Sequence, residues 1–298
     1  MLIAVTGATG FLGRYIVNEQ LRRGDTCRCW YRSESDRGGF LEAGNRLQWI
    51  EGQLGDAGSN ARLVEGADAV VHAALPRAGN VGDAFPEFIR LNVMGSLELM
   101  HAAHRAGVGR FVFISTCAVH EKILDDRPLD EAHPLWPSGH YGAYKAAVEK
   151  FVHSFGLGEK WPACALRPTG IHGMRRPVQR SRWFGLVQQV IKGEPIDSQW
   201  GGKQVHAADC ARAVAALLTA PADRLTGEAF NCYGQYVTEE HIAAIAKAIT
   251  GSASRITEYG KRPQHEIDTR KIQALGVRFG GDASLEAYVR QLVEAARS

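Results

Sequence analysis

The chain has 298 residues, 45% of them hydrophobic and 22% charged, with a formal net charge of +3 at pH 7. These proportions are typical of a folded protein with a large core and exclude a disordered chain. Lys and Arg are scattered along the sequence, so we expect no nucleic-acid partner. No apolar run approaches about 18 residues, so we expect no membrane span and a cytoplasmic location. The six dispersed cysteines predict neither disulfides nor structural zinc.

Short apolar runs recur along the chain, with helical patterns between them. Runs of this length are typical of parallel strands that are buried on both faces. Their regular alternation with helices predicts an α/β protein with a Rossmann-type doubly wound parallel sheet. The expected strands cover 2–6, 26–31, 47–51, 69–74, 110–115 and 161–166, and a later one covers 228–234.

The alternation weakens after about residue 170, where the stretch "GMRRPVQRSRW" is followed by Gly- and Pro-punctuated sequence up to 204. We therefore expect two domains. The larger one comprises residues 1–170, with 205–235 returning to it. A smaller C-terminal lobe comprises 171–204 and 236–298.

The first strand leads into "TGATGFLG", in which Gly7, Gly10 and Gly13 precede a helix that ends at Gly24. Such a turn lets a dinucleotide pyrophosphate approach the backbone N–H groups at the positive end of the helix. A Cβ atom would collide with the phosphates or with the helix packing. The alternative is a glycine-rich turn without a ligand, but the strand before the turn and the βαβ spacing after it favour the dinucleotide.

The end of the second strand, "CRCWYRS", bears on the choice of dinucleotide. A carboxylate at this place accepts hydrogen bonds from the adenosine ribose, whereas a cation accommodates the 2′-phosphate of NADP. Tyr31 stands where the acid would be, and Arg32 follows. This favours NADP slightly over NAD, with Arg14 as a second phosphate contact. The alternative is that both arginines are solvated surface charges.

Tyr141 and Lys145 lie four residues apart in "HYGAYKAAVEKF" and so share one face of a helix. A phenol has a pKa of about 10, which a nearby ammonium and a nicotinamide cation would both lower. The tyrosine could then exchange a proton with an alcohol while hydride moves to or from the nicotinamide. A hydroxyl of Ser115 or Thr116, at the end of the strand "RFVFIS", would hold the carbonyl oxygen.

Ordered motifs along nearly the whole chain resemble those of the extended short-chain dehydrogenase/reductase superfamily, of the NAD(P)-dependent epimerase/dehydratase type. The motifs are "TGATGFLG", "ADAVVHAAL", "LNVMGSLELMHAAHRAGVGRFVFIST", "PLDEAHPLWPSGHYGAYK", "LRPTGIHG", "VHAADCARAV" and "GEAFN". The resemblance implies that Tyr141 is the acid/base and that Lys145 binds the nicotinamide ribose and lowers the tyrosine pKa. Thr116 aligns with the substrate-orienting hydroxyl, with Ser115 as the alternative. Adjacent strand residues point oppositely, so the two cannot serve equally.

The resemblance also implies which residues surround the dinucleotide. Gln53 stands where the family usually has an Asp that meets the adenine, a change that keeps hydrogen-bonding ability but removes charge. The implied contacts are Gly7, Thr9, Gly10, Phe11, Leu12, Gly13, Arg32, Gln53, Leu54, Ala73, Ala74, Asn92, Lys145, Pro168 and Ile171.

Two departures from the family pattern bear on the chemistry. Dehydratases of the superfamily carry an Asp-Glu pair directly after the hydroxyl residue, where this chain has Cys117 and Ala118, so we expect no dehydratase activity. The Arg that usually precedes the "VH" step is missing as well. A basic set could replace it at a substrate diphosphate, or could be a solvated loop: Arg175, Arg176, Arg180, Arg182 and Lys203.

Two further features have alternative interpretations. His101 and His104 lie one helical turn apart, but no third ligand accompanies them, so we expect no metal site. Members of the family commonly form homodimers through the fourth and fifth helices. The apolar stripe of the fourth helix fits such an interface and fits an intramolecular core equally well: Leu91, Leu97, Leu99 and Met100.

Together these features predict an NAD(P)-dependent oxidoreductase or epimerase. It would act at a secondary alcohol or ketone of a small-molecule substrate, of which a nucleotide sugar is one candidate. The alternative is a catalytically silent NAD(P)-binding sensor or scaffold. The intact set of Thr116, Tyr141 and Lys145 argues against it, because a sensor needs only the glycine turn.

Overall fold

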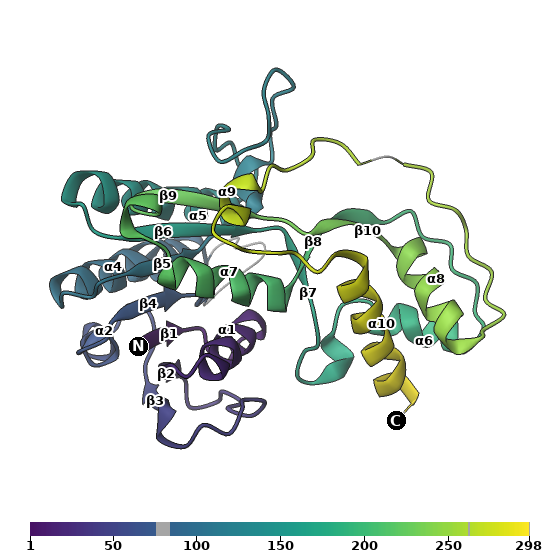
Figure 1. Cartoon of the computed structure of the whole chain (residues 1–298), viewed down its shortest axis with the longest axis horizontal. Helices are drawn as coiled ribbons and strands as arrows, with labels where there is room; N and C mark the ends of the chain where they lie inside the picture. The colour runs from purple at the N-terminus through teal and green to yellow at the C-terminus, as the bar shows by residue number, and fades with distance from the viewer. Residues whose placement is uncertain (76–83, 262, 298) are drawn as a thin grey trace. The chain divides into compact units, whose positions relative to one another are not determined.

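The computed structural model describes residues 1–75, 84–261 and 263–297 and divides the chain into two compact units (Figure 1). The first unit comprises Met1–Pro168, Cys210–Cys232 and Ile267–Val277. The second comprises Thr169–Asp209, Tyr233–Glu266 and Arg278–Ser298. The chain therefore returns to the first unit twice, whereas one return was expected from the sequence.

The first unit contains a seven-stranded sheet in the order β3-β2-β1-β4-β5-β6-β9, and all of its strand pairs are parallel. This confirms the predicted Rossmann-type fold. The chain order reverses between β1 and β4, which is where such sheets bind ligands. The strands are β1 Leu2–Thr6, β2 Thr26–Tyr31, β3 Leu47–Glu51, β4 Ala69–His72, β5 Phe111–Ile114, β6 Ala163–Pro168 and β9 Glu228–Cys232.

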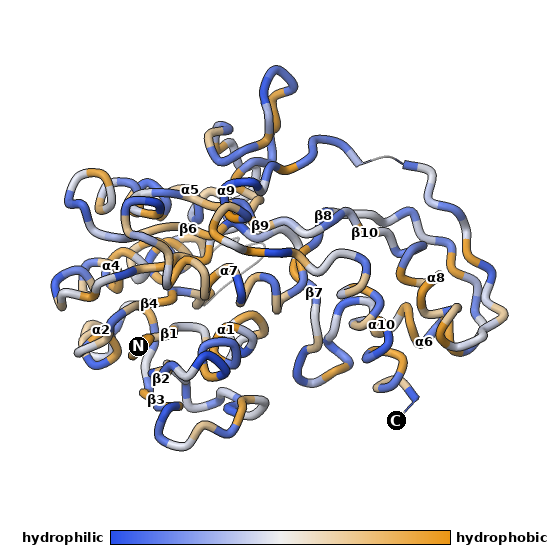
Figure 2. Tube along the Cα trace, viewed as in Figure 1, coloured by the Kyte–Doolittle hydropathy of each residue, from blue (hydrophilic) through white to orange (hydrophobic). Residues whose placement is uncertain are grey.

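Helices connect these strands and cover the sheet. On one face, Leu63, Leu99 and Val148 from three different helices pack in one buried cluster with Phe111 and Phe113 of β5. Figure 2 shows the corresponding hydrophobic segments along the strands and helices. The helices of this unit are α1 Phe11–Arg22, α2 Ala57–Val64, α3 Phe85–Ile89, α4 Gly95–Arg105, α5 His140–His153, α9 Arg270–Gln273 and most of α7 Ala207–Thr219.

Helix α1 ends where its sequence predicts. Gly24 has a φ of +89°, and its backbone N–H donates to the Leu21 carbonyl oxygen at 3.1 Å. A left-handed residue at this place suits glycine, because other residues carry a Cβ that disfavours the conformation.

Strand β6 begins and ends two residues later than the sequence predicts. Trp161, which was expected in the strand, instead donates its indole N–H to the Val108 carbonyl oxygen at 2.6 Å. Arg167 lies one residue beyond the predicted strand 161–166. It stays within β6 because Glu149 of α5 forms a buried ion pair with it.

The second return of the chain has specific contacts with the first unit. Ile267 forms a β-bridge with Leu129, and the ammonium of Lys271 lies 2.5 Å from the carboxylate of Glu228 in β9. Ile272 of α9 is fully buried. Its buried apolar residues, Ile267, Ile272 and Val277, are separated by five residues each, a spacing that matches neither a strand nor a helix and so does not mark the segment in the sequence.

The second unit has a three-stranded sheet in the order β10-β8-β7, formed by β10 Gln235–Thr238, β8 Gly201–His206 and β7 Gly170–His172. Its helices are α6 Phe184–Ile191, α8 Glu239–Thr250 and α10 Gly281–Arg297. Val187, Ile242 and Leu285 bring one face of each helix into a common core. In neither unit does a described helix have the length and hydropathy needed to cross a membrane.

Candidate functional site

The turn after β1 requires glycine mainly because neighbouring backbone atoms leave no room for a Cβ. Gly7 has a φ of +70°, and a Cβ there would come within 2.6 Å of the Ala73 backbone. A Cβ on Gly13 would lie 2.0 Å from the Gly7 carbonyl oxygen, and one on Gly10 would lie 3.0 Å from it. The sequence predicted a clash with phosphates or with helix packing. In the structure the backbone just after β4 and the backbone of the turn itself exclude the side chains.

The N-terminus of α1 fits a bound pyrophosphate. Its N-cap residue, Gly10, offers no side chain to the first N–H groups, and the first turn carries no acidic residue. The positive end of the helix therefore lies open beside the glycines. An uncapped helix end of this kind is a suitable place for phosphate oxygens.

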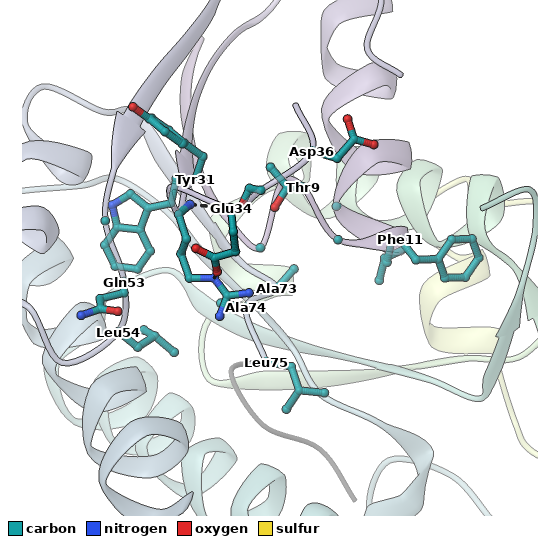
Figure 3. A pocket seen from close by; sticks show the side chains of 18 of the residues that line it. Thr9, Phe11, Tyr31, Glu34, Asp36, Gln53, Leu54, Ala73, Ala74 and Leu75 are labelled. Atoms are coloured by element: carbon teal, nitrogen blue, oxygen red, sulfur yellow. Dashed lines mark hydrogen bonds and ion pairs between the residues drawn. The ribbon is translucent and has the colours of Figure 1, made fainter. Parts of the chain in front are cut away.

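A cavity of about 570 Å³ adjoins this turn (Figure 3). It contains most of the predicted dinucleotide contacts: Gly7, Thr9, Gly10, Phe11, Leu12, Gly13, Arg32, Gln53, Leu54, Ala73 and Ala74. Other lining residues were not among the predicted contacts, although Tyr31 was predicted to stand at the ribose position: Trp30, Tyr31, Glu34, Ser35, Asp36, Gly52, Leu75 and Leu91. The charged run "RSESD" directly after β2 is the sequence signal that could have pointed to the acidic ones.

The predicted contacts that do not line this cavity lie elsewhere. Asn92 is buried in a π-helical turn, Arg90–Met94, where its side-chain amide donates to the Phe88 carbonyl oxygen at 3.0 Å. The Asn92 Oδ1 atom has no hydrogen-bond partner among the described residues. Pro168 ends β6, and Ile171 lies in β7 of the second unit.

Acidic residues accompany both arginines that were expected to bind a 2′-phosphate. Arg32 Nε lies 3.0 Å from a Glu34 carboxylate oxygen, and Arg14 Nη2 lies 3.1 Å from an Asp36 carboxylate oxygen. Arg14 also donates to the carbonyl oxygens of Asp36 and Gly38 at 2.7 and 3.0 Å. Arg14 therefore connects α1 to the loop after β2, and it does not line the cavity.

Three consecutive residues at the end of β5 contact three polar residues of α5. The Ile114 carbonyl oxygen accepts from Lys145 Nζ at 2.5 Å. The Ser115 hydroxyl donates to the Glu149 carboxylate, and the Thr116 side chain interacts with Tyr141. Thr116 thus lies beside Tyr141, Lys145 Nζ is held at the Ile114 carbonyl oxygen, and Ser115 points toward Glu149.

Burial shifts the pKa values of both candidate catalytic groups of α5. It lowers the pKa of Lys145 to about 7, and the negative charge of Glu149 opposes the shift. It raises the pKa of Tyr141, and the hydrogen bond from Thr116 opposes that shift. The lowered tyrosine pKa expected from the sequence is therefore absent from the protein alone, and further positive charge is needed to form the phenolate.

The two positions after Thr116 offer no carboxylate. Cys117 donates its thiol to the Arg167 carbonyl oxygen at 3.0 Å, and burial raises its pKa to about 12. A thiol with that pKa stays protonated near neutral pH and cannot replace a catalytic carboxylate. Ala118 has no titratable group.

The apolar stripe around α4 lies mostly in the core of the first unit. Leu99 and Met100 are fully buried and Leu97 packs against the same core, while Leu91 lines the cavity. The apolar stripe therefore serves the intramolecular core. Across the described ranges, no three His, Cys, Asp or Glu side chains gather as metal ligands would.

The basic set of the second unit is divided between different environments. Arg182 lies over the ring of Trp200 at 4.5 Å, and Lys203 donates to the Gln264 carbonyl oxygen at 2.7 Å. Arg175, Arg176 and Arg180 are exposed.

A known family shares the sequence pattern of this chain, in the region that contains the glycine turn, the cavity and the Tyr141–Lys145 pair. The model of the NAD dependent epimerase/dehydratase family matches residues 3–232. The chain belongs to this family. Its relatives include the 3 beta-hydroxysteroid dehydrogenase/Delta 5→4-isomerase of Mycobacterium tuberculosis, 31% identical over 198 residues. That match covers 64% of this chain and 52% of the relative, so the chain spans about half the length of that enzyme.

Other members of the epimerase/dehydratase family match over nearly the full chain. The low-salt glycan biosynthesis protein Agl12 of Haloferax volcanii is 28% identical, with 93% of each chain covered. The structure of DesIV, a dTDP-glucose 4,6-dehydratase from Streptomyces venezuelae solved with NAD and TYD, is 26% identical with a TM-score of 0.76, covering 99% of this chain and 97% of that one. The Thermus thermophilus UDP-glucose 4-epimerase in complex with NAD has a TM-score of 0.77 at 22% identity, covering 100% and 99%, and shows a shared fold.

Proposed function

We propose that this protein is an NAD-dependent oxidoreductase or epimerase that acts at a secondary alcohol or ketone, with Tyr141 as the acid/base. The observation that carries the proposal is the contact between the end of β5 and α5, in which the Thr116 side chain interacts with Tyr141 and Lys145 Nζ donates to the Ile114 carbonyl oxygen. The same unit contains the glycine turn and the cavity. A sensor or scaffold would not need this contact.

Each residue has a distinct proposed role. Tyr141 gives a proton to the substrate oxygen or takes one from it, and the Thr116 hydroxyl holds that oxygen. Lys145, charged, favours the phenolate. When bound along the glycine turn, the dinucleotide would accept or donate the hydride.

NAD is the dinucleotide that the charges and relatives favour. Arg32 was expected to select NADP, but Glu34 lies beside it in the same cavity and would repel a 2′-phosphate. DesIV, which is 26% identical to this chain, was solved with NAD. The slight preference for NADP predicted from Arg32 finds no support among these relatives.

The substrate is proposed only as a class. Similar structures include complexes with nucleotide sugars, such as a Thermotoga maritima epimerase with UDP-glucose, and relatives include hydroxysteroid dehydrogenases. Either class presents a secondary alcohol or ketone. Relatives also include the mouse dTDP-D-glucose 4,6-dehydratase. The absence of dehydratase activity stays a prediction, which Cys117 and Ala118 support because neither is a carboxylate.

The first experiment identifies the dinucleotide. Freshly purified protein is denatured, and the released nucleotide is identified and quantified by mass spectrometry. Near-stoichiometric NAD would support an epimerase, which regenerates its dinucleotide in every turnover. Empty protein that binds NADH in calorimetry would support a reductase. Protein that is empty and binds neither NADH nor NADPH would contradict the proposal.

A further inference from the structure

Helix α5 has a third polar residue on the face that presents Tyr141 and Lys145. Glu149 follows Lys145 by four residues, which places the two side chains one helical turn apart. The Glu149 side chain is fully buried. A buried carboxylate is costly unless it is paired and hydrogen-bonded, so its surroundings decide whether it stays charged.

Those surroundings favour the charged carboxylate. Arg167 of β6, itself buried, places Nη2 2.6 Å from Glu149 Oε2 and Nε 3.0 Å from the same oxygen. The Ser115 hydroxyl donates to Oε1. The remaining Arg167 donor, Nη1, lies 3.1 Å from both the Glu131 carbonyl oxygen and His120 Nε2. The Glu149–Arg167 ion pair is therefore held in place by hydrogen bonds to both of its members.

The other groups around Lys145 supply no negative charge. His72 of β4 interacts with Lys145 but is held between the hydroxyls of Thr6 and Ser96 at 2.7 and 2.9 Å, and burial lowers its pKa to about 3. It is therefore neutral near pH 7. The rings of Phe113 and Tyr144 lie 4.5 and 5.0 Å from Lys145 Nζ. Within the described part of the chain, Glu149 is the carboxylate whose field favours the ammonium.

We propose that Glu149, fixed by Arg167 and Ser115, is a positioning residue that keeps Lys145 charged beside Tyr141 by placing a buried negative charge one helical turn away. The inference rests on the proposed role of the Tyr141–Lys145 pair. Glu149 would act through Lys145 and would touch neither substrate nor dinucleotide.

The experiment measures the charge of Lys145 directly. The full-length protein is labelled with 13C at lysine Cε, and the Lys145 signal is assigned by its loss in Lys145→Met and followed from pH 5 to 11. Exposed lysines titrate near pH 10.4 and are separated from the buried one. In Glu149→Gln we expect the Lys145 midpoint to fall by about one pH unit below its wild-type value, because the opposing charge is gone.

Two further variants separate charge from packing. Ser115→Ala removes the hydroxyl contact but keeps the carboxylate, so the Lys145 midpoint should stay within about 0.3 pH units of wild type, far less than one charge would shift it. Glu149→Gln with Arg167→Met leaves no buried unpaired charge. Because the positive charge of Arg167 leaves with the carboxylate, its midpoint should fall by less than about one pH unit, and it can be measured even where Glu149→Gln alone fails to fold. An unchanged midpoint in a folded variant that lacks Glu149 would overturn the inference.

The inference and the proposed function can fail separately. If Tyr141→Phe retains turnover while the Lys145 midpoint still falls in Glu149→Gln, the acid/base assignment is wrong and the electrostatic role of Glu149 stands. If Tyr141→Phe loses turnover and the midpoint does not move, the acid/base assignment stands and the role of Glu149 is wrong.

Discussion

The Thr116 side chain interacts with Tyr141 where the end of β5 meets the start of α5. Thr116 also accepts from the Ala118 backbone N–H at 3.1 Å, and this contact fixes its side chain. A substrate oxygen held by the threonine would therefore lie within reach of the phenol. This pair and the cavity beside the glycine turn are the two places where substitutions should change activity or dinucleotide binding.

Tyr141→Phe should lose turnover and keep dinucleotide binding. Removing a general acid/base typically costs about 100-fold or more in kcat, whereas the ring and its packing remain. Tyr144→Phe is the matched control. It changes a neighbouring buried tyrosine of the same helix, whose hydroxyl has no partner among the described residues. Kinetics on a substrate found by screening, together with NAD calorimetry, check the prediction. Equal losses in both variants would contradict it.

Thr116→Val and Ser115→Ala should differ in effect. Valine keeps the shape of threonine but cannot hold a developing negative charge, a loss worth about 100-fold in kcat. Ser115→Ala removes a contact to Glu149 and should cost about tenfold less than Thr116→Val. Measured kcat values for the two variants decide between the hydroxyls. A larger loss for Ser115→Ala would reverse the assignment.

Local signals in the sequence predicted the glycine turn, the parallel strands and the Tyr141–Lys145 pair. Each depends on a spacing of a few residues, which the sequence displays directly. The alignment favours Thr116 over Ser115, but neighbouring strand residues point oppositely, and only the packing of α5 shows which of the two faces Tyr141.

Other features could not be predicted because they depend on contacts that only the folded chain shows, most of them between residues that are far apart in the sequence. Arg167 gave no sign of belonging to a strand, because its partner Glu149 lies 18 residues away in another element. Arg32 indicates NADP by its position alone, whereas its ion pair with Glu34, two residues later, is seen only in the structure. Ile267 returns to the first unit through Leu129, more than a hundred residues earlier in the chain.

Gly13→Ala should impair folding or dinucleotide binding. Its Cβ would lie 2.0 Å from the Gly7 carbonyl oxygen, and the backbone fixes the positions of both atoms, so they cannot separate without opening the turn. Gly185→Ala in α6 is the control, since its Cβ would meet nothing within 4 Å. Alanine is favoured over glycine within helices by about 0.5–1 kcal/mol, so this variant should be slightly more stable. Thermal unfolding and NAD calorimetry distinguish the two. A Gly13→Ala protein that folds and binds NAD normally would contradict the predicted clash between the new Cβ and the Gly7 carbonyl oxygen.

Glu34→Gln should shift dinucleotide preference toward NADP. The change removes a negative charge from the cavity and releases Arg32 from its ion pair. The pair is exposed and screened, so the ratio of the NADP and NAD dissociation constants should change about twofold to fivefold. Arg32→Gln should shift the ratio the other way. Calorimetry with both dinucleotides measures it, and wild-type protein that already prefers NADP would overturn the proposal of NAD.

The free energy of unfolding should fall as pH drops below 6.5, because buried histidines are neutral in the folded protein. Burial lowers the pKa of His72 and of His172 to about 3, and that of His120 to about 4. The unfolded chain binds a proton on each near its ordinary pKa of about 6.5, so below that pH the unfolded state gains protons that the folded state does not.

For His72 alone the loss between pH 6.5 and 4.5 is on the order of 2 kcal/mol, since one pKa unit corresponds to about 1.4 kcal/mol. Urea unfolding of wild type and of His72→Gln at both pH values isolates this contribution. Glutamine cannot take up a proton, so the variant should lose less stability than wild type over the same interval, whatever its stability at pH 6.5. An equal loss in both proteins would mean that His72 is already protonated in the folded state, and the hydroxyls of Thr6 and Ser96 would then both have to accept from its ring.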